Sequence, residues 1–159
     1  MKGNQQIIDK LNTLLTGELT AADQYMIHSR MLEDLGFSVL HERLDHESKE
    51  ELEHADVLVK RILFLEGTPD FNTRDALNIG TDVVAMFTND LAVEYQVAEA
   101  LRETIALCEQ ERDYITRDVL IPLLRDTEED HMRWLERQLG LITKVGVQNY
   151  LRSKMGVSR

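Results

Sequence analysis

The 159-residue sequence contains very little cysteine and proline. Its single cysteine, Cys108, cannot form a disulfide within the chain, so we expect a reducing location, the cytoplasm. A chain of this length can bury a core without disulfides in one domain, which we place over residues 1–159. The two prolines and few aromatic residues accompany abundant Leu, Glu, Ala and Arg, a balance that favours a mostly helical protein.

Long apolar runs are also missing. No segment reaches the roughly 20 apolar residues that a membrane-spanning helix needs, and the first residues lack the apolar core of a signal peptide. We therefore expect no membrane partner.

Positively charged residues are fewer than negatively charged ones, with 18 Lys and Arg against 29 Asp and Glu. The resulting net charge of −11 argues against nucleic acid as a partner.

Apolar residues recur at steps of three and four along most of the sequence, which is the period of an amphipathic helix. We expect an all-α protein with four long helices and a short terminal one, over residues 4–34, 38–66, 82–110, 113–141 and from 146 onward. Residues 67–81, which include Pro69 and Gly80, read as a long connection. Since the other connections are short, this order predicts a four-helix bundle with a long crossover between its second and third helices.

Two Glu-x-x-His motifs stand out: Glu51 with His54, and Glu128 with His131. Residues three apart share one face of a helix, so each motif presents a carboxylate and an imidazole to a common point. Both motifs fall on the apolar stripes of their helices, which should face the core. Two matches of so short a pattern are suggestive and need further support.

Two further glutamates supply that support. Glu18 and Glu94 interrupt the apolar stripes of the first and third helices. Each half of the chain thus carries a lone glutamate and then a Glu-x-x-His motif, 33 residues later in the first half and 34 in the second. Packed together, the two halves would bring four glutamates and two histidines to one level. Such a ligand set suits iron or manganese, whereas buried salt bridges with Arg or Lys are the alternative.

These residues lie in a sequence that resembles the bacterioferritins over nearly its whole length. The resemblance rests on four segments, residues 8–25 (IDKLNTLLTGELTAADQY), 51–56 (ELEHAD), 62–67 (ILFLEG) and 148–151 (QNYL). It implies a ferritin-like bundle, a cage of 24 subunits that stores ferric mineral, and two irons per subunit. The di-iron ligands that it implies are Glu18, Glu51, His54, Glu94, Glu128 and His131. Glu51 and Glu128 would bridge the two irons.

The sequence departs from that family at the haem site. Haem-binding bacterioferritins use a methionine directly after the second ligand glutamate, a position that Leu52 occupies here without a donor atom. We therefore expect no haem b in a cage made only of this chain, whereas a mixed cage with a haem-ligating subunit could hold it. Met31 and Met86 are interpreted as packing residues rather than replacement ligands.

A second departure lies in the fourth helix. An added residue, Thr127, separates Asp126 from the second motif, and Pro122 precedes it in the same helix. One extra residue would turn the ligands that follow by about 100° in a regular helix, and proline removes a backbone donor. We therefore predict a one-residue bulge between about residues 118 and 127.

Three further side chains are candidates for roles near this site. Tyr25, seven residues after Glu18, either donates an electron or packs in the core. His46 and Glu50, one turn apart on the second helix, form either an iron site on the inner surface of a cage or an exposed helix pair. We favour the exposed pair.

The sequence therefore predicts a ferroxidase that oxidises two Fe(II) ions and stores the ferric product. The alternatives are another di-iron enzyme on the same bundle, such as a peroxidase or oxygenase, and a purely structural cage subunit. Short loops and the lack of a rubredoxin-like cysteine motif argue against the first, and the intact ligand set argues against the second. Three questions stay open: whether dioxygen or hydrogen peroxide is the oxidant, how iron enters, and whether a ferredoxin partner drives iron release.

Overall fold

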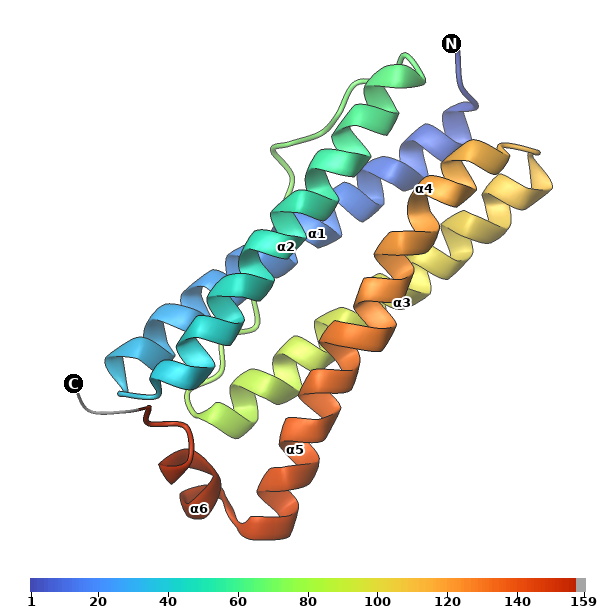
Figure 1. The fold of residues 1–159 in the computed structure, drawn as a ribbon. Coiled ribbons are helices and arrows are strands. Elements are labelled where there is room, and N and C mark those ends of the chain that lie inside the picture. Colours follow the sequence, from blue (N-terminus) through green and yellow to red (C-terminus); the bar gives the residue numbers. More distant parts are fainter. Residues whose placement is uncertain (157–159) are drawn as a thin grey trace.

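The computed structural model describes residues 1–156, which form an all-α bundle, as the sequence predicted. Its elements are α1 (Gln5–Asp34), α2 (Ser38–Phe64), α3 (Val83–Gln110), α4 (Tyr114–Arg125), the π-helix η1 (Asp126–Met132), α5 (Arg133–Val145) and α6 (Val147–Arg152). In Figure 1, α1 and α2 form one antiparallel pair, and α3 pairs with the long rod made of α4, η1 and α5. Within the described residues, no helix is both long and apolar enough to cross a membrane.

Side chains from the preceding turns fix the starts of three helices. Asn4 accepts hydrogen bonds from the first backbone amides of α1, Asp82 from the amide of Ala85 in α3, and Asp113 from that of Thr116 in α4. Each of these contacts satisfies an amide that has no partner within its own helix. The short α6 folds back against the end of the bundle, where the Tyr150 hydroxyl donates to Gln138.

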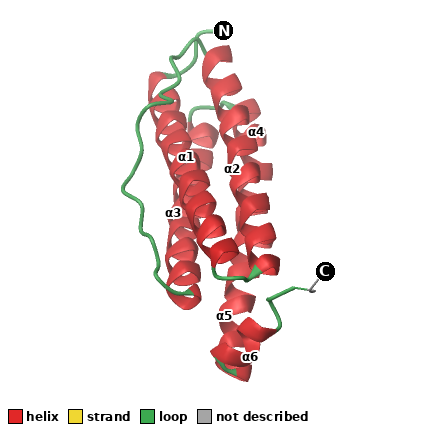
Figure 2. Ribbon diagram, turned by 90° about the vertical axis from the view of Figure 1, so that its left-hand side faces the viewer, coloured by secondary structure: helices red, strands yellow, loops and turns green. Residues whose placement is uncertain are grey.

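The long crossover between α2 and α3 runs down the outside of the bundle (Figure 2). Side chains of α1 hold it there. Thr20 Oγ1 accepts from the amide of Asp75, and Gln24 Oε1 accepts from the amide of Asn78. Further along, the amide of Gly80 donates to the buried His28. The other ring nitrogen of His28 donates to the buried Asp90 of α3, so the last of these anchors joins three parts of the chain.

The core consists of two apolar clusters at opposite ends of the bundle. One cluster contains Ile7, Leu11, Leu58 and Leu101, and the other contains Leu32, Leu44, Met86, Phe87 and Leu135. On every long helix, buried polar residues lie between the residues that belong to the two clusters, and together they form a polar layer across the bundle. Met31 packs against the second cluster, so both methionines considered above lie in or beside the core.

The fourth helical rod is not a regular α-helix. It contains Pro122 within α4 and then widens into the π-helix η1 over Asp126–Met132. The backbone hydrogen bonds of a π-helix span five residues, one more than those of an α-helix, so a π-helical segment can accommodate the extra residue. The predicted widening is therefore present, although it begins at the end of the expected window and continues beyond it.

Candidate metal centre

Five of the six predicted ligands converge in the polar layer at the middle of the bundle. They are contributed by α1, α2, α3 and η1, and all are buried: Glu18, Glu51, His54, Glu94 and His131. His131 Nδ1 lies 2.7 Å from Glu51 Oε1 and 3.2 Å from Glu94 Oε1. His54 Nδ1 lies 3.5 Å from Glu18 Oε2 and 3.7 Å from Glu51 Oε2. The two imidazole rings stack with their centroids 5.9 Å apart.

The geometry divides these residues into two overlapping ligand groups. Glu18, Glu51 and His54 bring one ligand atom each to within 4.8 Å of one another, and Glu51, Glu94 and His131 do the same. Glu51 belongs to both groups, and its two oxygens face different histidines. The arrangement fits two cations held side by side with the Glu51 carboxylate between them.

Burial disfavours the ionised form of the carboxylates in this cluster. Among the described residues, both carboxylate oxygens of Glu18 and of Glu51 find no hydrogen-bond partner of ordinary geometry. Burial, followed by repulsion from Glu51, holds the pKa of Glu18 well above its usual range. Burial likewise raises the pKa of Glu94, against the opposing effect of His131. More buried carboxylates than the two histidines can neutralise point to a need for further positive charge.

The histidines supply part of that charge as protons. Burial by itself would lower the pKa of His54, but its contacts with Glu18 and Glu51 outweigh burial and raise the pKa to about 11. The pKa of His131 is raised as well, because its carboxylate neighbours outweigh the effect of burial. A cation that binds here must displace these protons, so binding and proton release are linked.

Glu128 lies outside this cluster. Its side chain is 39% exposed and accepts from Arg102, with Nη2 at 2.7 Å and Nε at 3.2 Å. The buried side chain at this point of the π-helix is Thr127, whose hydroxyl donates to the carbonyl of Leu123. The sequence-based placement of Glu128 on the core-facing stripe is therefore wrong. That placement assumed 3.6 residues per turn, and the wider helix changes which residue faces inward.

Acidic side chains outside the two Glu-x-x-His motifs surround the other nitrogen of His131. Glu47 is buried and contacts His131 Nε2, and Glu50 Oε2 lies 2.7 Å from the same atom. Together with Asp130 they form a third group able to hold a cation. Arg43 binds both Glu47 and Asp130. The sequence did contain a signal, since Glu47 lies one turn before Glu51 on the same helix face.

Comparison with known proteins agrees with the site and the bundle. The family model of the ferritin-like domain matches residues 8–145. The chain belongs to the ferritin family. It is 57% identical to the bacterial ferritin of Pseudomonas aeruginosa over 155 residues, which cover 98% of this chain and 100% of that protein. It is 53% identical to the bacterial ferritin of Synechocystis over 98% of this chain and 99% of that protein. The bacterioferritin of Mycolicibacterium paratuberculosis is 39% identical, with 94% of each chain covered.

Tyr25 directly contacts a ligand group of this ferritin-family chain. Its buried hydroxyl donates to Glu94 Oε1 at 2.5 Å. Burial, followed by the charge of Glu94, raises the pKa of the phenol well above its usual range. The phenol is thus held in its protonated form with a carboxylate ready to accept the proton. The other aromatic side chain on this rod, Trp134, packs edge-on against Phe87, and the Arg43 guanidinium lies 4.9 Å from its ring centroid.

The exposed pair His46 and Glu50 extends from the cluster to the surface. His46 Nε2 lies 2.8 Å from Glu50 Oε1, and the His46 side chain is 60% exposed. Glu50 is only 25% exposed, and its other oxygen contacts His131. His46 is therefore exposed, whereas Glu50 is partly buried and belongs to the group around His131, so both interpretations of the pair stay open.

Leu52, for which the sequence resemblance implied a haem-ligand position, lies on the outer side of α2. Its side chain is 49% exposed, while its neighbour Glu51 points into the bundle. The side chain at this position thus faces away from the metal centre, where a second subunit could meet it.

Proposed function

We propose that this ferritin-family chain stores iron and acts as a ferroxidase, with Fe(II) as its substrate at the buried cluster. One observation carries the proposal: two groups of carboxylate and imidazole ligands share Glu51 in the buried polar layer. Apart from the histidines of these groups, no side chain among the described residues donates a hydrogen bond to the carboxylates of Glu18 and Glu51. Oxygen and imidazole ligands suit iron. Membership of the ferritin family supports the same metal and the same role.

Each residue then has a distinct task. Glu18 and His54 hold one Fe(II), Glu94 and His131 hold the other, and Glu51 lies between them. Two neighbouring ions can give up one electron each in a single event. One dioxygen and two protons then become one hydrogen peroxide, or one hydrogen peroxide and two protons become two waters. This pairing avoids release of a one-electron oxygen radical.

The charge balance of the cluster supports this assignment. In the metal-free chain, the protons of His54 and His131 offset part of the carboxylate charge. Fe(II) replaces those protons, and Fe(III) is stabilised further by the buried carboxylates. Tyr25 could supply one more electron while passing its proton to Glu94, across their 2.5 Å contact.

We further propose that residues 1–159 form one subunit of a homo-oligomeric cage of 24 chains in the cytoplasm. Large apolar side chains remain exposed on α1, α2 and the crossover, among them Met26, Leu52, Leu63, Phe64 and Phe71. A cage would cover such side chains. A haem-ligating subunit could join a mixed cage, and a ferredoxin could act as the reductant for iron release. Light scattering that finds only monomers or dimers would contradict the storage role.

The decisive experiment is rapid mixing of the metal-free protein with two Fe(II) per subunit in the presence of oxidant. Wild-type protein should oxidise the iron rapidly, and Glu94→Ala should lose that phase because one ion loses its carboxylate. Glu103→Ala is the matched control, since Glu103 lies on the same helix and its side chain is 58% exposed. Normal oxidation by Glu94→Ala would refute the assignment.

A further inference from the structure

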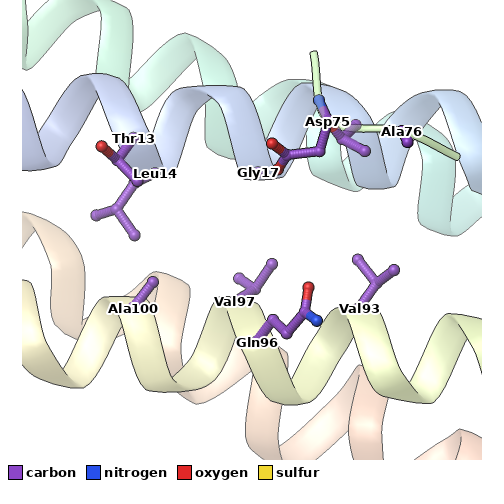
Figure 3. Close-up of a pocket in the computed structure, with 10 residues that line it drawn as sticks. Thr13, Leu14, Gly17, Asp75, Ala76, Val93, Gln96, Val97 and Ala100 are labelled. Atoms are coloured by element: carbon purple, nitrogen blue, oxygen red, sulfur yellow. The ribbon is translucent and has the colours of Figure 1, made fainter.

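A small cavity opens between α1 and α3 on the face of the bundle away from α2 and α4 (Figure 3). Its volume is about 150 Å³. Leu14 reaches into it from α1, and Val93, Val97 and Ala100 reach into it from α3. The crossover forms part of its rim at Asp75 and Ala76. The proposed function makes no use of this cavity.

The cavity lies at the same level of the bundle as the metal centre. Gly17, which lines it, directly precedes Glu18, and Val93 directly precedes Glu94. Glu18 and Glu94 are fully buried and turn inward, while their neighbours turn toward the cavity. Only the packing of α1 against α3 therefore separates the cavity from the two carboxylates that complete the site.

The chemistry of the cavity suits a small apolar molecule. Most of its wall surface is apolar and comes from Leu, Val and Ala side chains, while Thr13, Asp75 and Gln96 add polar groups to the lining. The hydroxyl of Thr20 is already engaged, since it donates to the carbonyl of Thr16 and accepts from the amide of Asp75. Apolar cavities hold water poorly and take up gases and small hydrocarbons.

Acidic groups lie on a different side of the metal centre. Glu47 and Glu50 on α2 and Asp130 on η1 surround His131, and His46 extends this group to the surface. A cation would be attracted to that side and not to the wall formed by Leu14 and Val97. The two substrates of the proposed reaction thus have separate approaches, one lined by several acidic groups and the other mostly apolar with a single carboxylate, Asp75, at its rim.

We propose that the cavity between α1 and α3 is the port through which dioxygen reaches the metal centre. This inference rests on the proposed oxidation of Fe(II) and names the route of its second substrate. Gly17 keeps the port open. A Cβ atom at this residue would contact Val97 Cγ2 at 3.8 Å, so alanine fits, whereas a longer side chain would fill the space.

The test uses two variants that fill the port from opposite walls, Gly17→Leu and Ala100→Leu. The matched control is Ala92→Leu, which adds the same side chain at an exposed position of α3 that does not line the cavity. Xenon serves as the probe of occupancy in pressurised crystals. We expect xenon between Leu14 and Val97 in the wild type and the control, and none in the two port variants.

Kinetics provide the second measurement on the same proteins. Both port variants should require a severalfold higher dioxygen concentration for half-maximal Fe(II) oxidation, while oxidation by hydrogen peroxide and anaerobic Fe(II) binding stay unchanged. The control should match the wild type throughout.

Three outcomes would overturn the port. The first is the absence of xenon from the wild-type cavity, and the second is an unchanged dependence of the oxidation rate on dioxygen concentration in both variants. The third is an assembled protein in which a side chain of a neighbouring subunit fills the cavity. A wild type that does not oxidise Fe(II) with either oxidant would instead refute the proposed function, so the two failures are distinguishable.

Discussion

At the scale of single residues, His54 links the charge of the metal centre to stability. Contacts with Glu18 and Glu51 raise its pKa from 6.5 to about 11 in the folded chain. A raised histidine pKa adds stability below the unfolded value, and that stability is lost as pH rises toward the folded value. The free energy of unfolding of the metal-free protein should therefore fall between about pH 6.5 and 11. Urea titrations at several pH values measure it, and His54→Gln should show a shallower fall.

Glu128 is the residue on which sequence and structure differ most. Because Arg102 holds it at the surface, Glu128→Ala should reduce rapid Fe(II) oxidation far less than Glu94→Ala does. We expect at least a ~100-fold loss for Glu94→Ala, equivalent to about 2.7 kcal/mol, and a loss within about tenfold for Glu128→Ala. Stopped-flow absorbance measures both rates. Equal losses would mean that Glu128 leaves Arg102 and binds iron.

At the scale of elements, the π-helix decides which side chain of the fourth rod faces inward. Deleting Thr127 should restore a regular helix and turn Glu128 from Arg102 toward the metal centre. The metal-free variant should then be less stable than the wild type, because another carboxylate is buried. Zinc, which is redox-inert, should raise its Tm by more than it raises that of the wild type. Calorimetry with and without zinc tests this, and an unchanged Glu128–Arg102 pair would contradict it.

The crossover depends on one close backbone approach. A Cβ atom at Gly80 would lie 2.3 Å from the backbone nitrogen of Met86, which cannot move away without displacing the start of α3. Gly80→Ala should therefore lower the free energy of unfolding by about 1–3 kcal/mol or more, as overpacking does. Gly140→Ala is the control, since nothing lies within 4 Å of its Cβ position in α5. There we expect a gain of about 0.5–1 kcal/mol from the helix. Urea denaturation of both variants gives these values.

Periodicity was sufficient to predict the long helices and the crossover. The starts of α1, α2 and α3 fall within one residue of the predicted positions, because apolar stripes and turn residues mark them. The same periodicity failed for Glu128, since the wider turns of η1 break the rule that the prediction used. Glu47 lies one turn before Glu51 on the same face of α2, but it belongs to neither Glu-x-x-His motif, and only the structure shows that it contacts His131.

At the scale of the whole molecule, Leu52 on the outer face of α2 allows a test of our expectation that a cage made only of this chain holds no haem. Leu52 is exposed and close to methionine in volume, so Leu52→Met should add a sulfur donor without disturbing the fold. We expect the variant homo-oligomer to bind more haem than the wild type. Visible absorption after haem addition measures it. Leu63→Met is the control, because it adds an exposed methionine elsewhere on the same helix. Equal haem binding by all three proteins would contradict the expectation.

The layer of charge between the two apolar clusters has a consequence for the cooperativity of folding. The clusters stabilise the two ends of the bundle, while the middle holds buried carboxylates of Glu18 and Glu51 that make no hydrogen bond of ordinary geometry within the described residues. Local opening starts where stabilising contacts are fewest, so an empty subunit can open at its centre while both ends stay packed. If iron binds in this layer as we propose, it would add contacts at the level where the metal-free chain has fewest, and the two ends should then unfold together. Iron binding should therefore slow hydrogen exchange most for the backbone amides in the middle of the long helices.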